Sequence, residues 1–178
     1  TENTMLCRLI QAYLDEKDEE GIMLFLDLEK AFDRVSHEYL YEAAKAAGVG
    51  KHMLGWIDTL YNPYNPMQRS TQVNGHKSEP FPIRSGVAQG CPLSPILFLF
   101  VTEGFSRYLQ ESEASFEGIT IDGRCLRISQ FADDTVLFLK NYDQIKPIFD
   151  RLLPLFEAAT GMLANVTKTE GLQLGKLR

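Results

Sequence analysis

The segment Phe131-Ala132-Asp133-Asp134 joins two apolar runs, 126–130 and 135–139, each with the length and composition of a β-strand. Two adjacent acidic residues between apolar strands are unusual, because a buried carboxylate is costly unless something compensates its charge. At the tip of a tight hairpin both carboxylates can converge on a divalent cation, and oxygen ligands suit Mg2+. A turn that is simply exposed to water explains this segment equally well when it is considered alone.

Another acidic residue, Asp27, lies at the end of the apolar run 21–28. Such a run is typical of a central strand covered on both sides, and at its end a carboxylate can face a cleft. If this strand pairs beside the hairpin, three carboxylates meet at one point. Such a cluster suits two divalent ions about 4 Å apart, which align a hydroxyl nucleophile and a phosphate leaving group.

A glycine-containing loop, residues 86–95, lies between the two acidic segments in the sequence. Its glycines permit a ligand to approach the backbone closely. Ser94 and Pro95 indicate the start of a helix that runs to about residue 110, and the backbone N–H groups there can bind phosphate. A tight turn before a buried helix is the alternative interpretation.

The remaining sequence predicts a mixture of helices and hairpins. Further helices are expected over 2–14, 36–47, 52–61 and 142–160, with a kink or break at Pro154 in the last. Asn74-Gly75 and Asp122-Gly123 indicate two more hairpins, and residues 163–174 are expected to form a loop and an edge strand. Residues 29–35 are interpreted as a short connection, and His37, His52 and His76 as surface residues. This order predicts an α+β fold whose helices pack on one face of an antiparallel sheet and leave the other face open as a cleft.

Composition limits the class of protein. The chain has 178 residues, 44% of them hydrophobic, which is enough for one domain with a sizeable core. The longest apolar run, 96–101, is too short to span a membrane, and three scattered cysteines with three histidines make a zinc site improbable and fit a reducing compartment. The net charge of −6 disfavours nucleic-acid binding. Either the basic surfaces lie on parts of the protein outside this chain, or the chain does not bind nucleic acid by itself.

Four segments, in this order, resemble motifs A, B, C and D of reverse transcriptases. They are Leu26-Asp27-Leu28-Glu29-Lys30-Ala31-Phe32-Asp33, Gly86-Val87-Ala88-Gln89-Gly90-Cys91-Pro92-Leu93-Ser94-Pro95, Phe131-Ala132-Asp133-Asp134, and residues 161–165 with Lys168. The sequence is most similar to non-LTR (LINE-type) retrotransposons. The resemblance implies that residues 1–178 form the antiparallel palm sheet of a polymerase with part of the fingers. It also implies that the upstream fingers motifs, the thumb and the endonuclease lie outside this chain.

The resemblance also implies a metal site. Asp27 and Asp133 would be the principal ligands of two Mg2+ ions, for which Mn2+ is a possible substitute. Asp134 would be the third, weaker carboxylate, and the backbone carbonyl of Leu28 would touch one ion. Lys168 matches the motif D lysine that protonates the departing pyrophosphate, with a solvated lysine as the alternative.

Other residues are implied to bind the nucleotide or the template. Phe32 matches the aromatic gate whose ring clashes with a ribose 2′-OH, and a core phenylalanine is the alternative. Gln89 and Gly90 would contact the nascent base pair and the template, and Ala132 belongs to the same set. Ala88 departs from the family pattern, in which many relatives carry a basic residue, and this weakens the expectation of a template phosphate contact there.

The function implied by the resemblance is RNA-directed DNA polymerisation. The substrates would be dNTPs, an RNA template and a DNA primer whose 3′-OH is the nucleophile. We expect an intracellular protein, in the nucleus at the integration site and in the cytoplasm as a ribonucleoprotein, with no membrane partner. One alternative is a catalytically inactive remnant that serves as a structural or interaction module. Another alternative is the palm of an RNA-dependent RNA polymerase. Phe32 disfavours it, because the ring would clash with the 2′-OH of a ribonucleotide.

Overall fold

The protein is described by a computed structural model that covers residues 2–111 and 116–177. Its helices are α1 (Glu2–Lys17), α2 (Ala31–Arg34), α3 (His37–Ala46), α4 (Lys51–Tyr61), α5 (Ser94–Glu111), η1 (Tyr142–Gln144), α6 (Ile145–Pro147), η2 (Ile148–Leu152) and α7 (Leu153–Thr160). Its strands are β1 (Glu20–Leu26), β2 (Leu28–Glu29), β3 (Gln68–Arg69), β4 (Gln72–Val73), β5 (His76–Lys77), β6 (Phe81–Pro82), β7 (Ile119–Ile121), β8 (Arg124–Leu126), β9 (Ile128–Phe131), β10 (Asp134–Leu139), β11 (Leu163–Ala164) and β12 (Glu170–Gly175). In the described part of the chain no helix is both long and apolar enough to cross a membrane.

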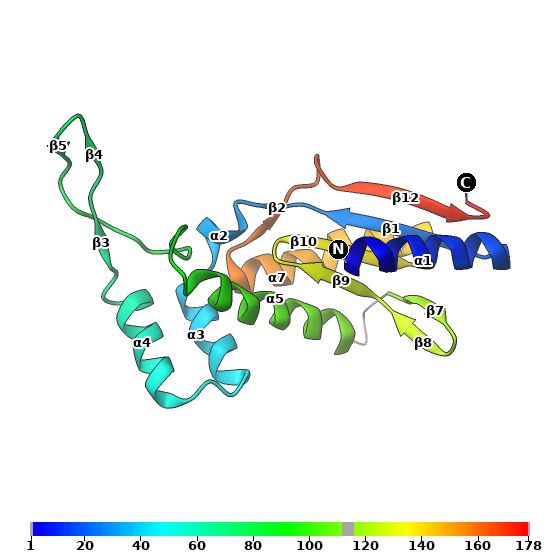
Figure 1. Ribbon diagram of the computed structural model, residues 1–178, viewed down its shortest axis with the longest axis horizontal. Coiled ribbons are helices and arrows are strands. Elements are labelled where there is room, and N and C mark those ends of the chain that lie inside the picture. Colours follow the sequence, from blue (N-terminus) through cyan, green and yellow to red (C-terminus); the bar gives the residue numbers. More distant parts are fainter. Residues whose placement is uncertain (1, 112–115, 178) are drawn as a thin grey trace.

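The centre of the fold is a four-stranded antiparallel sheet in the order β12-β1-β10-β9. Four consecutive residues of β1, 21–24, are buried, so this strand is the central, doubly covered strand that its apolar run predicts. Figure 1 shows strands β12, β1, β10 and β9 one below another, with α1 on the near side of the sheet. The antiparallel sheet and the α+β class are therefore confirmed.

Successive residues of the central strands bury their side chains in different cores, because neighbours along a strand point to opposite faces. The larger core lies between the sheet and helices α3, α4, α5 and α7, and it includes Leu24, Leu137, Phe98, Phe105 and Phe156. The smaller core lies between the sheet and α1, and it includes Ile10, Leu14, Met23, Phe138 and Leu174.

The expectation that all helices share one face needs correction, because α1 packs on the opposite face. The apolar residues Ile10 and Leu14 of α1 are fully buried against that face. A groove of about 580 Å3 remains beside α1, lined by Phe25, Asp134 and Leu172 among others. The expected cleft is therefore present, but it is narrower than an uncovered sheet face.

One local expectation was also wrong, and another holds only in part. Residues 29–35 are not an irregular connection, since they hold the end of β2 and the short helix α2. Residues 145–160 stay helical through Pro154, which lies in the first turn of α7, directly after the π-helical segment η2. Prolines and π-helical turns are both causes of helix kinks, so an irregularity lies where the kink or break was expected, but the break is absent.

The predicted hairpin at Asn74-Gly75 is confirmed. Val73 pairs with His76, and Asn74 and Gly75 have φ angles of 49° and 82°, as a type I′ turn requires. The second pairing, between β3 and β6, extends this hairpin into a two-stranded ribbon, residues 68–82. The ribbon projects from the body of the molecule in Figure 1, and the residues of its strands are exposed.

Candidate functional site

Strand pairing brings the acidic segments of motifs A and C together. In the β1–β10 pair, Leu26 lies opposite Thr135. Continuing this antiparallel register by one residue places Asp27 opposite Asp134, and opposed residues have Cα atoms about 5 Å apart and side chains on the same face. That face carries the groove beside α1, which Asp134 lines. Asp27 is half-buried, whereas Asp134 is exposed.

Asp133 lies in a two-residue turn, since Phe131 pairs with Asp134 across it. Ala132, the other turn residue, has a φ angle of 55°. This left-handed conformation costs a non-glycine residue about 1–2 kcal/mol, and strain of this kind is concentrated at functional sites. The turn leaves Asp133 exposed at the tip of the hairpin, next to the Asp27–Asp134 pair.

The donor set fits a hard divalent cation, because all three acidic side chains offer carboxylate oxygens. Among residues 2–111 and 116–177, however, no three His, Cys, Asp or Glu side chains are arranged closely enough to hold a metal ion. Strand register therefore brings two carboxylates together and places the third in the adjoining turn. The metal site that the sequence predicts at Asp27, Asp133 and Asp134 therefore stays a prediction.

Motif D is joined to motif A by backbone hydrogen bonds. Strand β11 pairs with β2, with Ala164 opposite the buried Leu28. The backbone N–H of Asn165 donates to the carbonyl of Asp27 at 2.7 Å, and the N–H of Lys168 donates to the carbonyl of Asn165 at 3.1 Å. Lys168 is exposed in this turn. The sequence-predicted lysine therefore lies one short turn away from the backbone of the candidate metal ligand.

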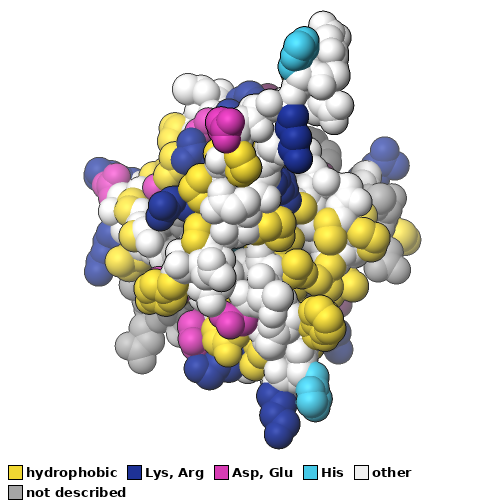
Figure 2. Space-filling model, turned by 90° about the vertical axis from the view of Figure 1, so that its left-hand side faces the viewer, with side chains coloured by type: hydrophobic (Ala, Val, Ile, Leu, Met, Phe, Trp, Pro, Cys, Tyr) yellow, Lys and Arg dark blue, Asp and Glu magenta, His cyan; other side chains and the backbone are white. Residues whose placement is uncertain are grey.

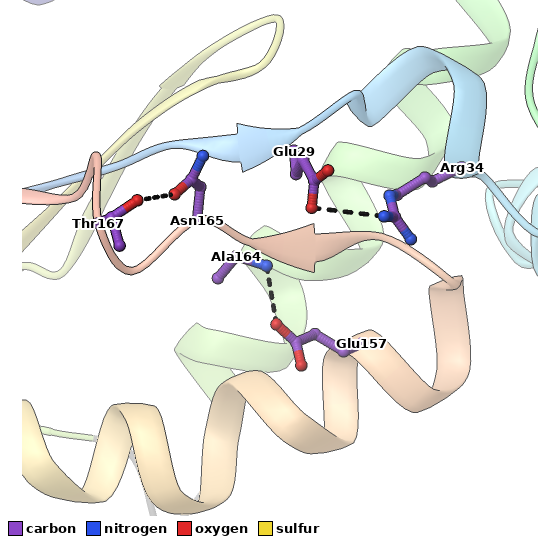
Figure 3. Close-up of polar contacts among 6 residues, drawn as sticks. All are labelled: Glu29, Arg34, Glu157, Ala164, Asn165 and Thr167. Atoms are coloured by element: carbon purple, nitrogen blue, oxygen red, sulfur yellow. Dashed lines mark hydrogen bonds and ion pairs between the residues drawn. The ribbon is translucent and has the colours of Figure 1, made fainter.

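Polar side chains support this junction, as Figure 3 shows. Glu157 of α7 accepts a hydrogen bond from the N–H of Ala164 at 2.7 Å, and Arg34 pairs with Glu29 at 3.3 Å across the start of motif A. The Arg34–Glu29 pair is partly exposed and contributes little energy. It joins a residue of α2 to a residue of β2.

The motif B loop docks on the segment that follows Asp27. The N–H of Gly86 donates to the carbonyl of Val35 at 2.8 Å, and the N–H of Val87 donates to the carbonyl of Phe32 at 2.7 Å. Gly86 has a φ angle of 82°, and a Cβ atom there would lie 2.5 Å from the carbonyl oxygen of Asp33. Only glycine permits this approach, so the sequence motif sets the distance between motifs A and B.

His37 is not the surface residue that its sequence position suggested. It is 3% exposed, and its Nε2 lies 2.9 Å from the carbonyl oxygen of Gly86. Its ring also meets the edge of the Tyr61 ring, whose hydroxyl accepts from the N–H of Ala88 at 3.4 Å. Burial lowers the pKa of His37, so the neutral ring donates to Gly86. Nothing in the sequence around His37 marks it as buried, because the contact spans 49 residues.

We expect His37→Leu to lower the free energy of unfolding by about 1–3 kcal/mol, because the Gly86 carbonyl loses its buried donor. His37→Gln keeps a donor at the same reach and retains most of the stability. The native state disfavours the charged ring, so the parent chain loses stability as the pH falls below 6.5, the ordinary pKa of this group. Denaturant titrations at about pH 7.5 and pH 5.5 measure both effects.

The exposed His52→Gln variant is the control for the His37 substitutions, and it should match the parent chain at both pH values. The account of His37 fails if His37→Leu unfolds at the same denaturant concentration as the parent. It also fails if His37→Gln loses as much stability on acidification as the parent does.

The remaining sequence-predicted residues lie around the same junction. Phe32 of α2 is half-buried and stacks on Phe98 of α5, with ring centroids 4.3 Å apart. Gln89 is exposed, and its side-chain amide donates to Asp33 at 3.1 Å. Gly90 is exposed with a φ angle of 81° and open space around it. The contact between Gln89 and Asp33 gives Asp33 a structural role that the sequence alone did not reveal.

Comparison with known proteins places this geometry in a family. Residues 2–175 match the family described as reverse transcriptase (RNA-dependent DNA polymerase). The chain is 35% identical over 143 residues to the Retrovirus-related Pol polyprotein from type-2 retrotransposable element R2DM of Drosophila melanogaster. It is 30% identical over 157 residues to the Transposon TX1 uncharacterized 149 kDa protein of Xenopus laevis. The matches cover 80% and 87% of this chain, but only 13% and 12% of these relatives.

The fold has a solved counterpart. The structure of telomerase from Candida tropicalis in complex with the TWJ fragment of telomeric RNA superposes with a TM-score of 0.70, over 97% of this chain and 29% of that one. The sequence identity is 14%, so the likeness concerns the fold alone. The four motifs meet where β1 and β2 pair with β10 and β11, and the family match covers residues 2–175. The chain therefore belongs to the reverse transcriptase family, with relatives in retrotransposable elements of the non-LTR type.

Proposed function

We propose that this chain is the palm of an RNA-directed DNA polymerase, with part of the fingers, that extends a DNA primer along an RNA template with dNTPs. The observation that supports the proposal is the β1–β10 register, in which Leu26 lies opposite Thr135. Extended by one residue, this register would set Asp27 opposite Asp134 and near Asp133. The chain spans only a small part of its long relatives, and the fingers, thumb and endonuclease parts of a parent polyprotein are its expected partners. Its expected locations are the nucleus at the integration site and the cytoplasm as a ribonucleoprotein.

The acidic residues would hold the divalent metal ions that enzymes of this family use. We assign Mg2+ to this site, with Mn2+ as a substitute, because the donors are carboxylates and a backbone carbonyl. Bound there, two such ions supply activation of the primer hydroxyl and neutralisation of the leaving pyrophosphate. Asp27 and Asp133 would be the principal ligands, Asp134 would complete the carboxylate set, and the carbonyl of Leu28 would add an oxygen.

The other residues orient the substrates and move a proton. Lys168 is exposed and carries an ammonium group that can protonate the departing pyrophosphate. Gln89 and Gly90 are exposed and Ala132 is half-buried, so all three are accessible to a template and a nascent base pair. The docked motif B loop fixes Gln89 relative to motif A through Asp33.

Phe32 is the candidate gate against ribonucleotides. We expect Phe32→Val to raise the use of rNTPs relative to dNTPs by about 10- to 100-fold, because a shorter side chain makes room for the 2′-OH. Steady-state primer extension with each nucleotide set measures this ratio. Phe98→Leu is the matched control, since Phe98 is the stacking partner but is only 1% exposed and lies beneath Phe32. A Phe32→Val variant that loses stability without changing the ratio would make Phe32 a core residue only.

Primer extension by this chain tests the proposed function. The assay uses an RNA template, a DNA primer, dNTPs and Mg2+, with Asp133→Asn as the inactive reference. We expect this chain alone to be weak or inactive. Any extension, by the chain alone or within a longer polymerase, should be absent from the Asp133→Asn variant and should require dNTPs rather than rNTPs. Preference for rNTPs would support an RNA-dependent RNA polymerase. No extension by the parent chain, alone or within a longer polymerase, would support an inactive remnant.

A further inference from the structure

A groove of about 490 Å3 lies between the base of the ribbon and the motif B loop. Its lining includes Arg69 of β3, Asp33 of α2, and Ser85, Ala88 and Gln89 of the loop. Figure 2 views the molecule from the side on which the ribbon lies and shows several basic side chains on that face. The groove therefore joins a basic residue of the ribbon to the loop that is expected to contact the template.

Both walls of the groove are held in place. On the ribbon side, Arg69 pairs with Phe81 across the two strands. On the loop side, Ser85 donates to the carbonyl of Asp33 at 3.2 Å, and Ser94 donates to the carbonyl of Ala88 at 2.6 Å. These contacts span 52 and 6 residues, so they fix the loop both to α2 and to the start of α5. The groove is formed before any ligand enters, which reduces the ordering cost of binding.

Arg69 carries the positive charge of this groove. It is exposed, and within the described residues its guanidinium makes no ion pair or hydrogen bond. Asp33 also lines the groove, but its carboxylate accepts from the amide of Gln89. Hydrogen bonds from Leu93 and Ser94 lower the pKa of Cys91 in the loop, and the charge of Arg69 adds the smallest contribution in the same direction. The chain has a net charge of −6. The unpaired guanidinium of Arg69 nevertheless gives this groove a local positive charge that can bind an anion.

The chemistry of the anion follows from the position of the groove. A guanidinium binds phosphate oxygens through paired N–H donors. A nucleoside triphosphate must lie within reach of the metal ligands, and none of Asp27, Asp133 and Asp134 lines this groove. A phosphodiester of a strand that passes Gln89 does not have to lie near the metal ligands. The groove therefore suits the backbone of a single-stranded template rather than the incoming nucleotide.

We propose that Arg69 binds a backbone phosphate of the single-stranded RNA template in the groove between the ribbon and the motif B loop. This inference rests on the proposed function, because it assumes that the strand that passes Gln89 is the template. It also gives the chain a nucleic-acid contact despite its acidic net charge. Ala88, which offers no charge of its own, lies in the same groove, and Arg69 supplies the cation from the ribbon.

Fluorescence anisotropy of a labelled single-stranded RNA oligonucleotide, bound by the whole 178-residue chain at several salt concentrations, tests the inference. We expect Arg69→Ala to weaken binding about 5- to 10-fold at about 50 mM salt and to reduce the slope of log K against log salt by about 0.7, the value for one phosphate contact. The control is Lys77→Ala, which removes an exposed cation from the far end of the same ribbon and should leave both values unchanged.

A second substitution tests the position of the charge. In the Arg69→Ala background, Ala88→Arg returns a guanidinium to the same groove and should restore most of the affinity and the slope. Equal losses in Arg69→Ala and Lys77→Ala would overturn the inference, and so would an absence of RNA binding by the parent chain at low salt. A loss of dNTP affinity in Arg69→Ala, with RNA binding intact, would assign the phosphate to the nucleotide and also overturn it. Binding is measured without catalysis, so a chain that binds RNA through Arg69 but never extends a primer contradicts only the proposed function.

Discussion

Asp133→Asn is expected to abolish primer extension, leaving a rate below a few percent of the parent rate. An amide replaces a carboxylate that is expected to hold both divalent ions, so charge at the metal site is lost where two-metal chemistry depends on it. The substitution is nearly isosteric and lies on an exposed turn, so the fold should remain intact. Single-nucleotide incorporation on an RNA template, in the longer polymerase context that the relatives have, measures the effect.

Asp122→Asn is the matched control for this substitution. Asp122 is also exposed at the tip of a two-stranded hairpin, between β7 and β8, and it has a φ angle of 48° that asparagine tolerates. The control should keep full activity and the same denaturation midpoint as the parent. Extension by Asp133→Asn above a few percent of the parent rate would refute the assignment of Asp133 as a metal ligand.

Gly86→Ala should cause the largest loss of stability among single-methyl substitutions in motif B. The new Cβ atom would lie 2.5 Å from a backbone oxygen of Asp33, and the φ angle of 82° is strained for any residue with a side chain. Left-handed strain costs about 1–2 kcal/mol and the overlap costs about 1–3 kcal/mol more. We therefore expect the free energy of unfolding to fall by about 3 kcal/mol in a denaturant titration.

Gly48→Ala separates the two contributions. Gly48 has the same φ angle of 82°, but a Cβ atom there meets nothing within 4 Å. Its substitution should therefore cost only the left-handed strain, about 1–2 kcal/mol. Equal losses for Gly86→Ala and Gly48→Ala would show that the close approach of motif B to motif A contributes nothing to stability.

The sequence predicted those parts of the fold that depend on local pattern. The apolar run before Asp27, the runs around Asp133 and the Asn74-Gly75 turn all have short-range signals, and each forms the expected strand or hairpin. The capping residue Ser36 also accepts from the N–H of Tyr39 at 3.3 Å, as its position before a helix predicted. The two hairpins pair residues that are near neighbours in the sequence. The strand before Asp27 is marked by its own apolar run, although its partners β10 and β12 lie far along the chain.

The sequence did not predict features that depend on contacts between distant segments. The side of the sheet on which α1 packs is one, since an amphipathic helix has the same pattern on either face. The burial of His37 against Gly86 is another, because the ring is buried only once the motif B loop has docked. The groove with Arg69 likewise exists only where the ribbon returns to the loop. In the candidate site, residue identities were predicted from motifs, whereas the supports from Asn165 and Asp33 required the structure.

The central claim is that carboxylates far apart in the sequence share a pair of divalent ions, and a crystal structure with Mn2+ tests it most directly. Anomalous scattering should show two manganese peaks about 4 Å apart, between the carboxylates of Asp27 and Asp133. Side chains of Asp27 and Asp133 more than roughly 10 Å apart, too far to share ions at that spacing, would contradict the account.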